Sequence, residues 1–238
     1  MIKGLPIKKE SILVVIGIFI ILTFLIAVAS LNTTSSLDNK SSGEIIGNKS
    51  YGYVEKEVYG NQSASQTIVI ITGVHPRESG FHNITATVLK DKSSSLSKKY
   101  VLYKIHVTKK PMHFTIGRMN GQLLANYFVV PDVIKVNPQF VVDIHEDLWT
   151  EAGYKYPRFI YPISKDNITR NYLNTIVQSM PFLKIYSPGG SSPKYVTKPI
   201  SKAGIHVMVY ETYKKDSYEK KYSDASTFID VLDKMKYS

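Results

Sequence analysis

Residues 67–78 read Thr-Ile-Val-Ile-Ile-Thr-Gly-Val-His-Pro-Arg-Glu. The first six are all β-branched, a run typical of a strand buried on both faces of a mainly parallel sheet. The run leads into a loop that carries His75 and Glu78, separated by two residues. In α/β sheets, functional groups collect in the loops that follow strands. The stretch therefore predicts an α/β fold with a site at the end of this strand.

The pattern continues on both sides of this stretch. Apolar or alternating runs predict further strands at residues 53–59, 100–107, 139–145, 184–186 and 205–210. Helical periodicity predicts helices at residues 79–92, 167–180 and 223–235. Because strands and helices interleave, we expect an α/β domain with a mixed, mainly parallel sheet and helices on both faces.

Residues 11–30 form an apolar run without charge. At 1.5 Å per residue, about twenty helical residues span the ~30 Å hydrocarbon layer of a membrane. Three lysines precede the run, and the positive-inside rule places residues 1–10 in the cytoplasm. We therefore expect one transmembrane helix or signal anchor at 11–30, with the rest of the chain outside the cell membrane. Cleavage after the small residues 27–29 is the alternative, and it would give a secreted protein.

Residues 31–50 are rich in Asn, Ser, Thr and Gly and poor in apolar side chains. A segment of this composition does not bury enough surface to order itself, so we expect a flexible stalk. Residues 51–238 then form the folded domain.

The chain has no cysteine, which excludes disulfides, thiolate metal sites and cysteine nucleophiles. Any metal ion must therefore be held by His, Asp or Glu. The formal net charge is +11, but the cations are scattered lysines without an arginine-rich stripe, so we expect no nucleic-acid partner. A cationic surface fits lipid headgroups, an anionic cell-wall polymer or an acidic peptide.

His75 and Glu78 offer an imidazole and a carboxylate to one cation. These are the zinc ligands open to a chain without thiols, and a catalytic zinc site uses three protein ligands. The predicted strand at 139–145 ends in His145, our candidate for the third ligand. Asp143 lies two residues earlier on the same side of the strand, where it can orient that imidazole. Taken singly, a histidine in a polar loop is more often a surface residue than a metal ligand.

A further buried strand, residues 205–210, runs into Glu211. A carboxylate at such a position is costly to bury without a purpose, and it can act as a general base. Residues 184–192 form a glycine-rich loop with Tyr186, flexible enough to close on a substrate.

These features, in this order, resemble the zinc carboxypeptidase superfamily, which includes carboxypeptidase A-like enzymes and the succinylglutamate desuccinylase and aspartoacylase group. Residues 73–78 resemble the family's GxHxRE loop, and His145 resembles its second ligand histidine. Tyr186 with the Gly-Gly-Ser that follows resembles its tyrosine loop, and Glu211 its catalytic glutamate. The resemblance spans roughly residue 67 to the C-terminus.

The resemblance implies a zinc peptidase-like catalytic domain with Zn²⁺ held by three ligands, His75, Glu78 and His145. It implies that Glu211 takes a proton from the water that attacks an amide carbonyl and then protonates the leaving amine. It also implies that Arg77 contacts the substrate and that Tyr186 folds over it.

The chain also departs from the family pattern. The adjacent Asn-Arg pair with which carboxypeptidases hold the substrate's terminal carboxylate is absent between His75 and His145. Arg118 is the only arginine in that interval after Arg77, so it is our candidate for contact with a substrate anion or an oxyanion. Asp143, two positions before the histidine, is more typical of the acylase branch.

We therefore expect a membrane-anchored, extracytoplasmic zinc metallopeptidase, a hydrolase similar to metallocarboxypeptidases that acts on peptides or cell-wall peptides. A deacylase of small N-acyl amino acids is the alternative among enzymes, favoured by Asp143 and by the missing Asn-Arg pair. A non-catalytic cell-wall-binding module on the same fold is the alternative outside the enzymes.

Several polar and aromatic residues have a structural explanation that is at least as good as a functional one. Four histidines without a partner motif are expected to be structural: His82, His106, His113 and His206. Aromatic residues after His145 either line a substrate cleft or pack together: Trp149, Tyr154, Tyr156 and Tyr161. Glu146 and Asp147, beside His145, either replace Glu211 in an unusual site or lie in a solvated loop.

Overall fold

The computed structural model describes residues 43–188 and 194–237. The predicted cytoplasmic segment 1–10, the predicted membrane span 11–30 and residues 31–42 of the predicted stalk lie outside these ranges. Among the residues described, no helix combines the length and the apolar character needed to cross a bilayer.

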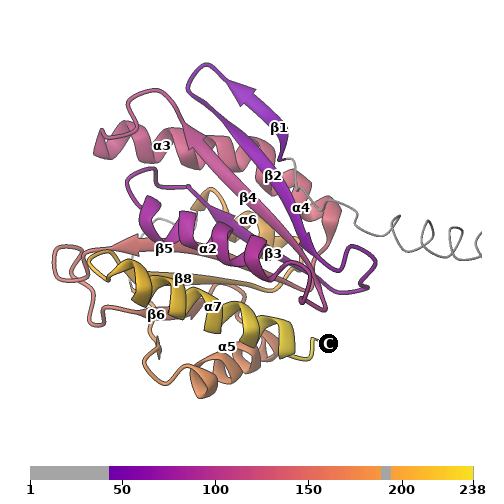
Figure 1. Cartoon of the computed structure of the whole chain (residues 1–238). Helices are drawn as coiled ribbons and strands as arrows, with labels where there is room; N and C mark the ends of the chain where they lie inside the picture. Colours follow the sequence, from indigo (N-terminus) through magenta and orange to yellow (C-terminus); the bar gives the residue numbers. More distant parts are fainter. Residues whose placement is uncertain (1–42, 189–193, 238) are drawn as a thin grey trace, which may run out of the picture. The chain divides into compact units, whose positions relative to one another are not determined.

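An eight-stranded sheet forms the centre of the domain, in the order β1-β2-β4-β3-β5-β8-β6-β7 (Figure 1). The strands are β1 (Glu44–Lys49), β2 (Gly52–Gly60), β3 (Thr67–Thr72), β4 (Lys99–Val107), β5 (Phe140–Asp147), β6 (Phe159–Pro162), β7 (Lys184–Ile185) and β8 (Val207–Tyr213). Strands β4, β3, β5 and β8 are parallel to one another. The pairs β1–β2, β2–β4 and β6–β8 are antiparallel, and β7 pairs parallel with β6 at the edge of the sheet. The prediction of an α/β domain built on a mixed sheet is confirmed.

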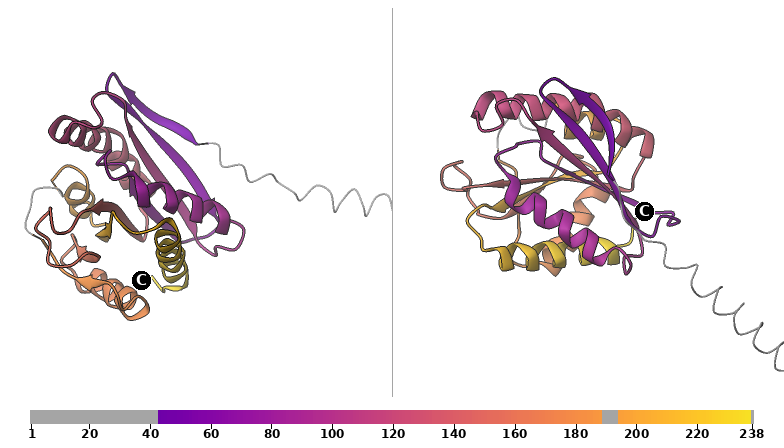
Figure 2. Two further views of the ribbon diagram at one scale, coloured as in Figure 1. Left: turned by 60° about the vertical axis from the view of Figure 1, so that its left-hand side comes forward. Right: turned by 45° about the horizontal axis from the view of Figure 1, so that its top comes forward.

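Helices cover both faces of the sheet (Figure 2). One face carries α2 (Ser79–Lys92), α5 (Asn167–Ser179) and α7 (Tyr218–Lys234). The other carries α3 (Phe114–Leu124), the π-helix η1 (Ala125–Val129), α4 (Val130–Val136) and α6 (Thr197–Lys202).

Strand β3 shows why its sequence is apolar at nearly every position. Ile68 and Ile70 pack into the core beneath α2, α5 and α7, whereas Val69 and Ile71 pack into the core beneath α3, α4 and α6. Successive side chains of a strand point to opposite faces, so a strand covered on both faces needs apolar residues throughout. All four side chains are fully buried.

The prediction of a flexible stalk at residues 31–50 was wrong at the C-terminal end of that range. Residues 44–49 form β1, an edge strand that pairs antiparallel with β2, so the folded domain begins by residue 44 and not at residue 51. The strand is short and largely exposed. Its order comes from main-chain hydrogen bonds to β2, which composition does not reveal.

We predicted no helix or strand between residues 108 and 138, where the structure has α3, η1 and α4. Helix α3 lies directly on the loop between β3 and α2. A Cβ atom on Gly121 of α3 would lie only 2.1 Å from the carbonyl oxygen of Val74. Glycine therefore permits the close packing that places this helix beside the loop of His75.

Candidate metal centre

Two neighbouring parallel strands bring the predicted ligands together. Strand β3 ends at Thr72, and the loop that follows carries His75 and Glu78 before α2 begins at Ser79. Strand β5 lies next to β3 and carries His145 near its carboxyl end. The carboxyl ends of parallel strands meet at one edge of a sheet, so residues that are distant in sequence become neighbours there.

The carboxylate of Glu78 lies between the two imidazoles. His75 Nδ1 is 2.9 Å from Glu78 Oε1, and His145 Nδ1 is 2.9 Å from Glu78 Oε2. The two rings have their centroids 4.5 Å apart. One candidate ligand atom from each residue lies within 4.8 Å of the others, and all three residues are buried. Two imidazoles and a carboxylate at this spacing fit a divalent transition-metal ion with further coordination positions left open.

Both imidazoles have a second contact on the side away from Glu78. Asp143 Oδ2 lies 3.2 Å from His145 Nε2, and Gln122 Nε2 lies 3.4 Å from His75 Nε2. A carboxylate on the far nitrogen of a histidine fixes the ring's orientation and raises its basicity toward a metal. Asp143 therefore lies where the sequence predicted.

The electrostatics of the three residues suit a bound cation. Burial lowers the pKa of His75, and Glu78 offsets this only in part. Burial acts in the same direction on His145, but Asp143 and Glu78 outweigh it and raise the pKa of this imidazole well above its usual range. Burial would raise the pKa of Glu78, but the two histidines hold it well below the ordinary value. The shifts thus favour a neutral His75, a charged His145 and an ionised Glu78.

Glu211 lies beside this group. It is the Cα partner of His145 in the pairing of β5 with β8, so its side chain leaves the sheet on the same face as His145. Its side chain is 7% exposed. Burial raises its pKa to about 8; His145 opposes this effect, and Glu78, Asp147 and Asp143 add to it. A carboxylate whose pKa lies near neutrality is suited to exchange protons with a substrate.

These shifts predict how the stability of the metal-free protein depends on pH. The pKa of Glu211 rises from 4.5 to about 8 in the folded state. Protonated Glu211 therefore contributes fully to the free energy of unfolding below about pH 4.5, and this contribution is lost as the pH rises toward 8. The raised pKa of His145 acts in the same direction, because that contribution is lost as the pH rises above the usual histidine value.

The lowered pKa values of His75 and His82 act in the opposite direction, but only below about pH 6.5. We therefore expect the unfolding free energy of the metal-free protein to fall between about pH 6.5 and pH 8, and to fall less in Glu211→Gln. Urea unfolding in the presence of a chelator, at several pH values across this range, measures both slopes. Identical slopes for the two proteins would show that Glu211 does not titrate in this window.

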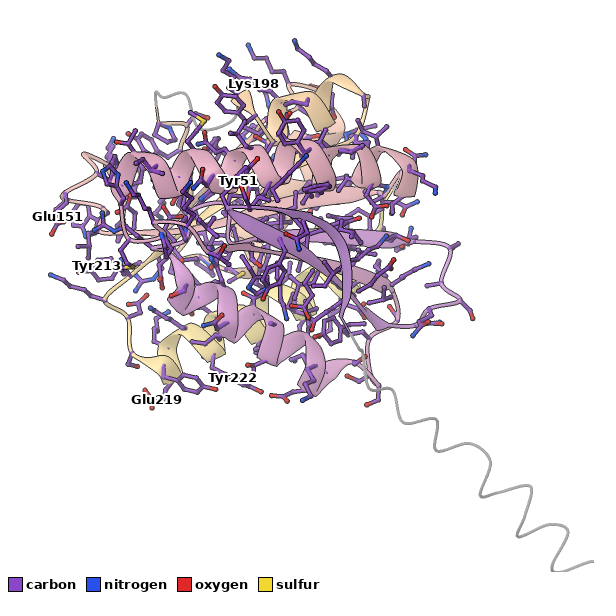
Figure 3. All side chains as sticks on the ribbon, turned by 90° about the horizontal axis from the view of Figure 1, so that it is seen from above. Tyr51, Glu151, Lys198, Tyr213, Glu219 and Tyr222 are labelled. Atoms are coloured by element: carbon purple, nitrogen blue, oxygen red, sulfur yellow. The ribbon has the colours of Figure 1, made fainter. Side chains whose placement is uncertain are left out.

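A cleft of about 410 Å³ opens onto two of the candidate ligands, His75 and Glu78. Its lining also includes Arg77, Arg118, Phe114, Lys214, Glu151 and Tyr154. Arg118 Nη1 lies 3.3 Å from Glu78 Oε1. Arg77 and Arg118 both lie against the ring of Phe114, with Cζ 5.9 Å and 5.2 Å from its centroid. Glu151 projects at the same end of the molecule as Tyr213, the last residue of β8 (Figure 3). The cleft therefore lies at the carboxyl ends of the strands, as predicted.

Tyr186, which we expected to fold over the substrate, is not among the residues that line this cleft. It lies in an aromatic cluster, with its ring 5.5 Å from that of Tyr156 and 5.1 Å from that of Phe159. Of the predicted aromatic candidates, Tyr154 lines the cleft, while Tyr156 and Tyr161 pack in the cluster. A glycine-rich loop after a strand was too general a signal to place a tyrosine over a substrate.

Glu146 is the clearest error among the residues assigned to a solvated loop. It lies within β5, and its side chain is 1% exposed. Its partners come from α2 and α7, which are remote in the sequence. Adjacency to His145 was the only sequence signal that pointed to it.

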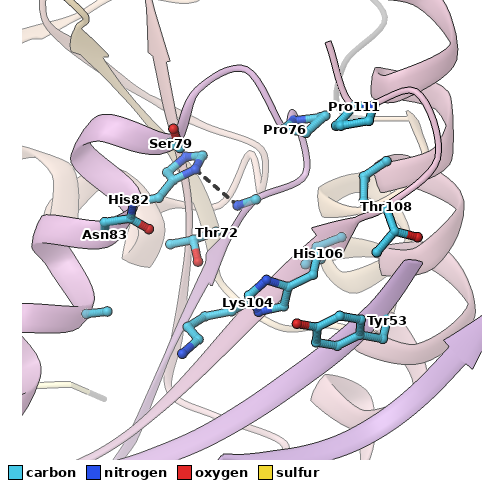
Figure 4. A pocket seen from close by; sticks show the side chains of 14 residues that line it. Tyr53, Thr72, Pro76, Ser79, His82, Asn83, Lys104, His106, Thr108 and Pro111 are labelled. Carbon is cyan, nitrogen blue, oxygen red and sulfur yellow. Dashed lines mark hydrogen bonds between the residues drawn. The ribbon is translucent and has the colours of Figure 1, made fainter. Parts of the chain in front are cut away.

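A second cleft, of about 460 Å³, is lined in part by Gly73 and Pro76 of the loop that carries His75 (Figure 4). His82 lies at its edge, where its Nδ1 accepts a hydrogen bond from the backbone N–H of Gly73 at 3.2 Å. The other ring nitrogen of His82 is 2.8 Å from the carbonyl oxygen of Ile144. His82 therefore joins the ligand loop to β5 as a structural residue. Lys104 in this cleft is neutralised by Glu55 and Glu57.

No protein-family model matches the sequence, and no curated protein is similar to it at a significant level. Solved structures do match. A metallo-carboxypeptidase from Burkholderia cenocepacia aligns over 95% of this chain and 68% of its own, with a TM-score of 0.57 at 13% identity. The chain has the metallo-carboxypeptidase fold. The resemblance to zinc carboxypeptidases that the sequence motifs indicated is confirmed at the level of the fold.

Two further solved structures are similar to the chain. A candidate metallopeptidase from Shewanella denitrificans covers 82% of this chain and 83% of its own, with a TM-score of 0.55 and 11% identity. The cell shape determinant Csd4 from Helicobacter pylori, solved with a bound tripeptide, covers 75% of this chain and 54% of its own, with a TM-score of 0.54 and 12% identity. These identities are too low to transfer an activity, so function must be argued from the site.

Proposed function

We propose that this chain is a zinc-dependent hydrolase of amide bonds that acts on peptides. The observation that carries the proposal is the buried group of His75, Glu78 and His145, whose candidate ligand atoms lie within 4.8 Å of one another. Burial of such a group without an ion would leave charged and polar groups crowded together at considerable cost. The metallo-carboxypeptidase fold of the chain supports the same conclusion.

A zinc ion held by these ligands supplies a Lewis acid that polarises a carbonyl and makes water acidic near neutral pH. Glu211 accepts a proton from the water that attacks the amide carbonyl and then donates it to the leaving nitrogen. Arg118, whose guanidinium lies beside Glu78 in the cleft, stabilises the negative charge that develops on the carbonyl oxygen. Arg77 contacts the substrate at the rim.

The bound tripeptide of Csd4 favours a peptide substrate over a small N-acyl amino acid. The cleft lining carries carboxylates as well as cations, and among the cations Arg77, Arg118 and Lys214 offer partners to an anionic group on that substrate. Peptides of the cell wall combine peptide bonds with free carboxylates. We therefore propose a wall-derived peptide as the substrate, with an anionic wall polymer as a further partner of the basic surface.

The location of the domain belongs to the same proposal. The uncharged apolar run at 11–30, with lysines before it, supports a single-pass anchor with the catalytic domain outside the cell membrane. Cleavage after residues 27–29 would release the domain as a secreted enzyme.

The test is an assay of the full-length protein in detergent against wall-derived peptides, other peptides and N-acyl amino acids. We expect peptide hydrolysis that a chelator abolishes and that added Zn²⁺ restores, because removal of the ion removes the Lewis acid. Turnover of N-acyl amino acids alone would identify a deacylase. Binding of wall peptides without turnover would identify a binding module and contradict the proposal.

A further inference from the structure

Glu146 follows His145 on β5, and its side chain leaves the sheet on the opposite face. Its carboxylate accepts hydrogen bonds from the first backbone N–H groups of α2. Oε2 accepts from Gly80 at 3.1 Å, and Oε1 accepts from Phe81 at 3.1 Å. The first N–H groups of a helix have no partner within the helix, so a buried helix start needs such acceptors. Glu146 supplies them from a different element.

Helix α2 needs this outside partner because its own capping residue is engaged elsewhere. Glu78 is the N-cap of α2, yet its side chain makes no capping hydrogen bond. Its two oxygens face His75 and His145 instead, each at 2.9 Å. The carboxylate at the usual capping position is thus turned toward the metal centre, and Glu146 takes over the capping.

Lys221 of α7 completes the arrangement. Its Nζ lies 2.5 Å from Glu146 Oε1 and donates to the carbonyl oxygen of Lys214 at 2.8 Å. Both charged side chains are buried, Glu146 at 1% exposure and Lys221 at 7%. Gly80 leaves the room they need, because a Cβ atom there would lie 2.7 Å from Lys221 Nζ and 2.8 Å from Glu146 Oε2. A buried pair with its hydrogen bonds satisfied holds its geometry tightly.

We propose that Glu146, neutralised by Lys221, is a positioning residue of the metal centre that acts on Glu78, as Asp143 acts on His145. Its side chain fixes the start of α2, and its backbone N–H donates to Glu78 Oε2 at 3.3 Å. One residue therefore sets the position of the ligand carboxylate from two sides, and the same residue is bonded directly to His145 in the chain. The inference rests on the proposed metal site, and it goes beyond that proposal by naming what holds the site's geometry.

The direct test is Glu146→Gln in the full-length protein, with Zn²⁺ affinity measured by competition with a chelator. Glutamine keeps the shape but offers one acceptor oxygen, and its amide group faces either a backbone N–H or the Lys221 ammonium. We expect Zn²⁺ to bind about 10- to 100-fold more weakly. The visible spectrum of the Co²⁺-loaded variant should also change, because the ligand geometry shifts. If Glu146→Gln does not fold, Glu146→Asp keeps the charge but shortens the reach to α2.

The matched control is Asp230→Asn. Asp230 of α7 lies 2.7 Å from Lys92 of α2, so this pair also joins α2 to α7, but at the other end of α2 from the metal centre. We expect Asp230→Asn to leave both Zn²⁺ affinity and the Co²⁺ spectrum unchanged. A loss of affinity as large as that of Glu146→Gln would show that any weakening of the contact between α2 and α7 has this effect, and it would overturn the inference.

Lys221→Met distinguishes two effects on Zn²⁺ affinity: the positioning of Glu146 by Lys221, and the repulsion between the Lys221 cation and the metal ion. Removal of a cation near the ion should strengthen Zn²⁺ binding if charge alone matters. The proposal expects weaker binding, because Glu146 loses the partner that holds it. Tighter or unchanged binding in Lys221→Met contradicts the inference. The proposed function is tested separately, by Zn²⁺ binding to the unsubstituted protein. If that protein does not bind Zn²⁺, the proposed function fails, whatever the variants do.

Discussion

Glu211→Gln should lower peptide hydrolysis by about 10²- to 10⁴-fold while Zn²⁺ affinity stays close to that of the unsubstituted protein. The amide of glutamine has nearly the same shape as the carboxylate but does not accept a proton from water. Glu211 lies opposite His145 across the pairing of β5 with β8, and it is separate from the group of three candidate ligands. The substitution therefore removes the proton acceptor and keeps the metal site.

The matched control is Glu57→Gln. Glu57 is also a buried glutamate, at 8% exposure, and it pairs with Lys104 on the β2 and β4 side of the sheet. We expect this variant to keep its activity within a few-fold, which a steady-state measurement of kcat and KM checks. Undiminished hydrolysis in Glu211→Gln would remove Glu211 from the mechanism and leave the metal site without an assigned base.

His75→Ala should abolish both Zn²⁺ retention and hydrolysis. The substitution leaves two protein ligands where a catalytic zinc site uses three, so we expect the affinity to fall by more than the roughly 100-fold seen when only an outer partner of a ligand is removed. Elemental analysis after dialysis against a weak chelator measures the metal content, and a peptide assay measures the activity.

His206→Ala is the control for His75→Ala. His206 lies 3.2 Å from Asp166 and is remote in sequence from the three ligands, and we expect this variant to retain its zinc. Thermal unfolding of both variants without metal shows whether either fold is damaged. If His75→Ala retained one zinc ion per chain, the assignment of this histidine as a ligand would be wrong.

The site residues that could be predicted from the sequence are those placed by the pattern of their own strand. His75, Glu78 and His145 could be assembled from sequence because strands β3 and β5 are apolar and end in polar ligands, and parallel strands bring their ends together. Asp143 could be placed by the two-residue repeat of a strand. Glu211 followed from the same logic on β8, although both it and His145 lie within their strands and not after them.

The residues that were missed owe their positions to partners far away in the chain. Glu146 is buried because the start of α2 and Lys221 of α7 both contact it. No local sequence pattern predicts these contacts. Tyr186 was assigned by a short glycine motif, yet its aromatic neighbours hold it in a cluster beside β6. Strand β1 exists because β2 offers it a free edge. Contacts of this kind are set by tertiary packing and not by propensity.

A crystal structure of the zinc-loaded protein, with data collected at the zinc absorption edge, would show whether His75, Glu78 and His145 hold one divalent ion. We expect one anomalous peak about 2.0–2.2 Å from His75 Nδ1, His145 Nδ1 and a carboxylate oxygen of Glu78. An anomalous peak at other residues, or none between these three in a crystal soaked with zinc, would contradict this assignment.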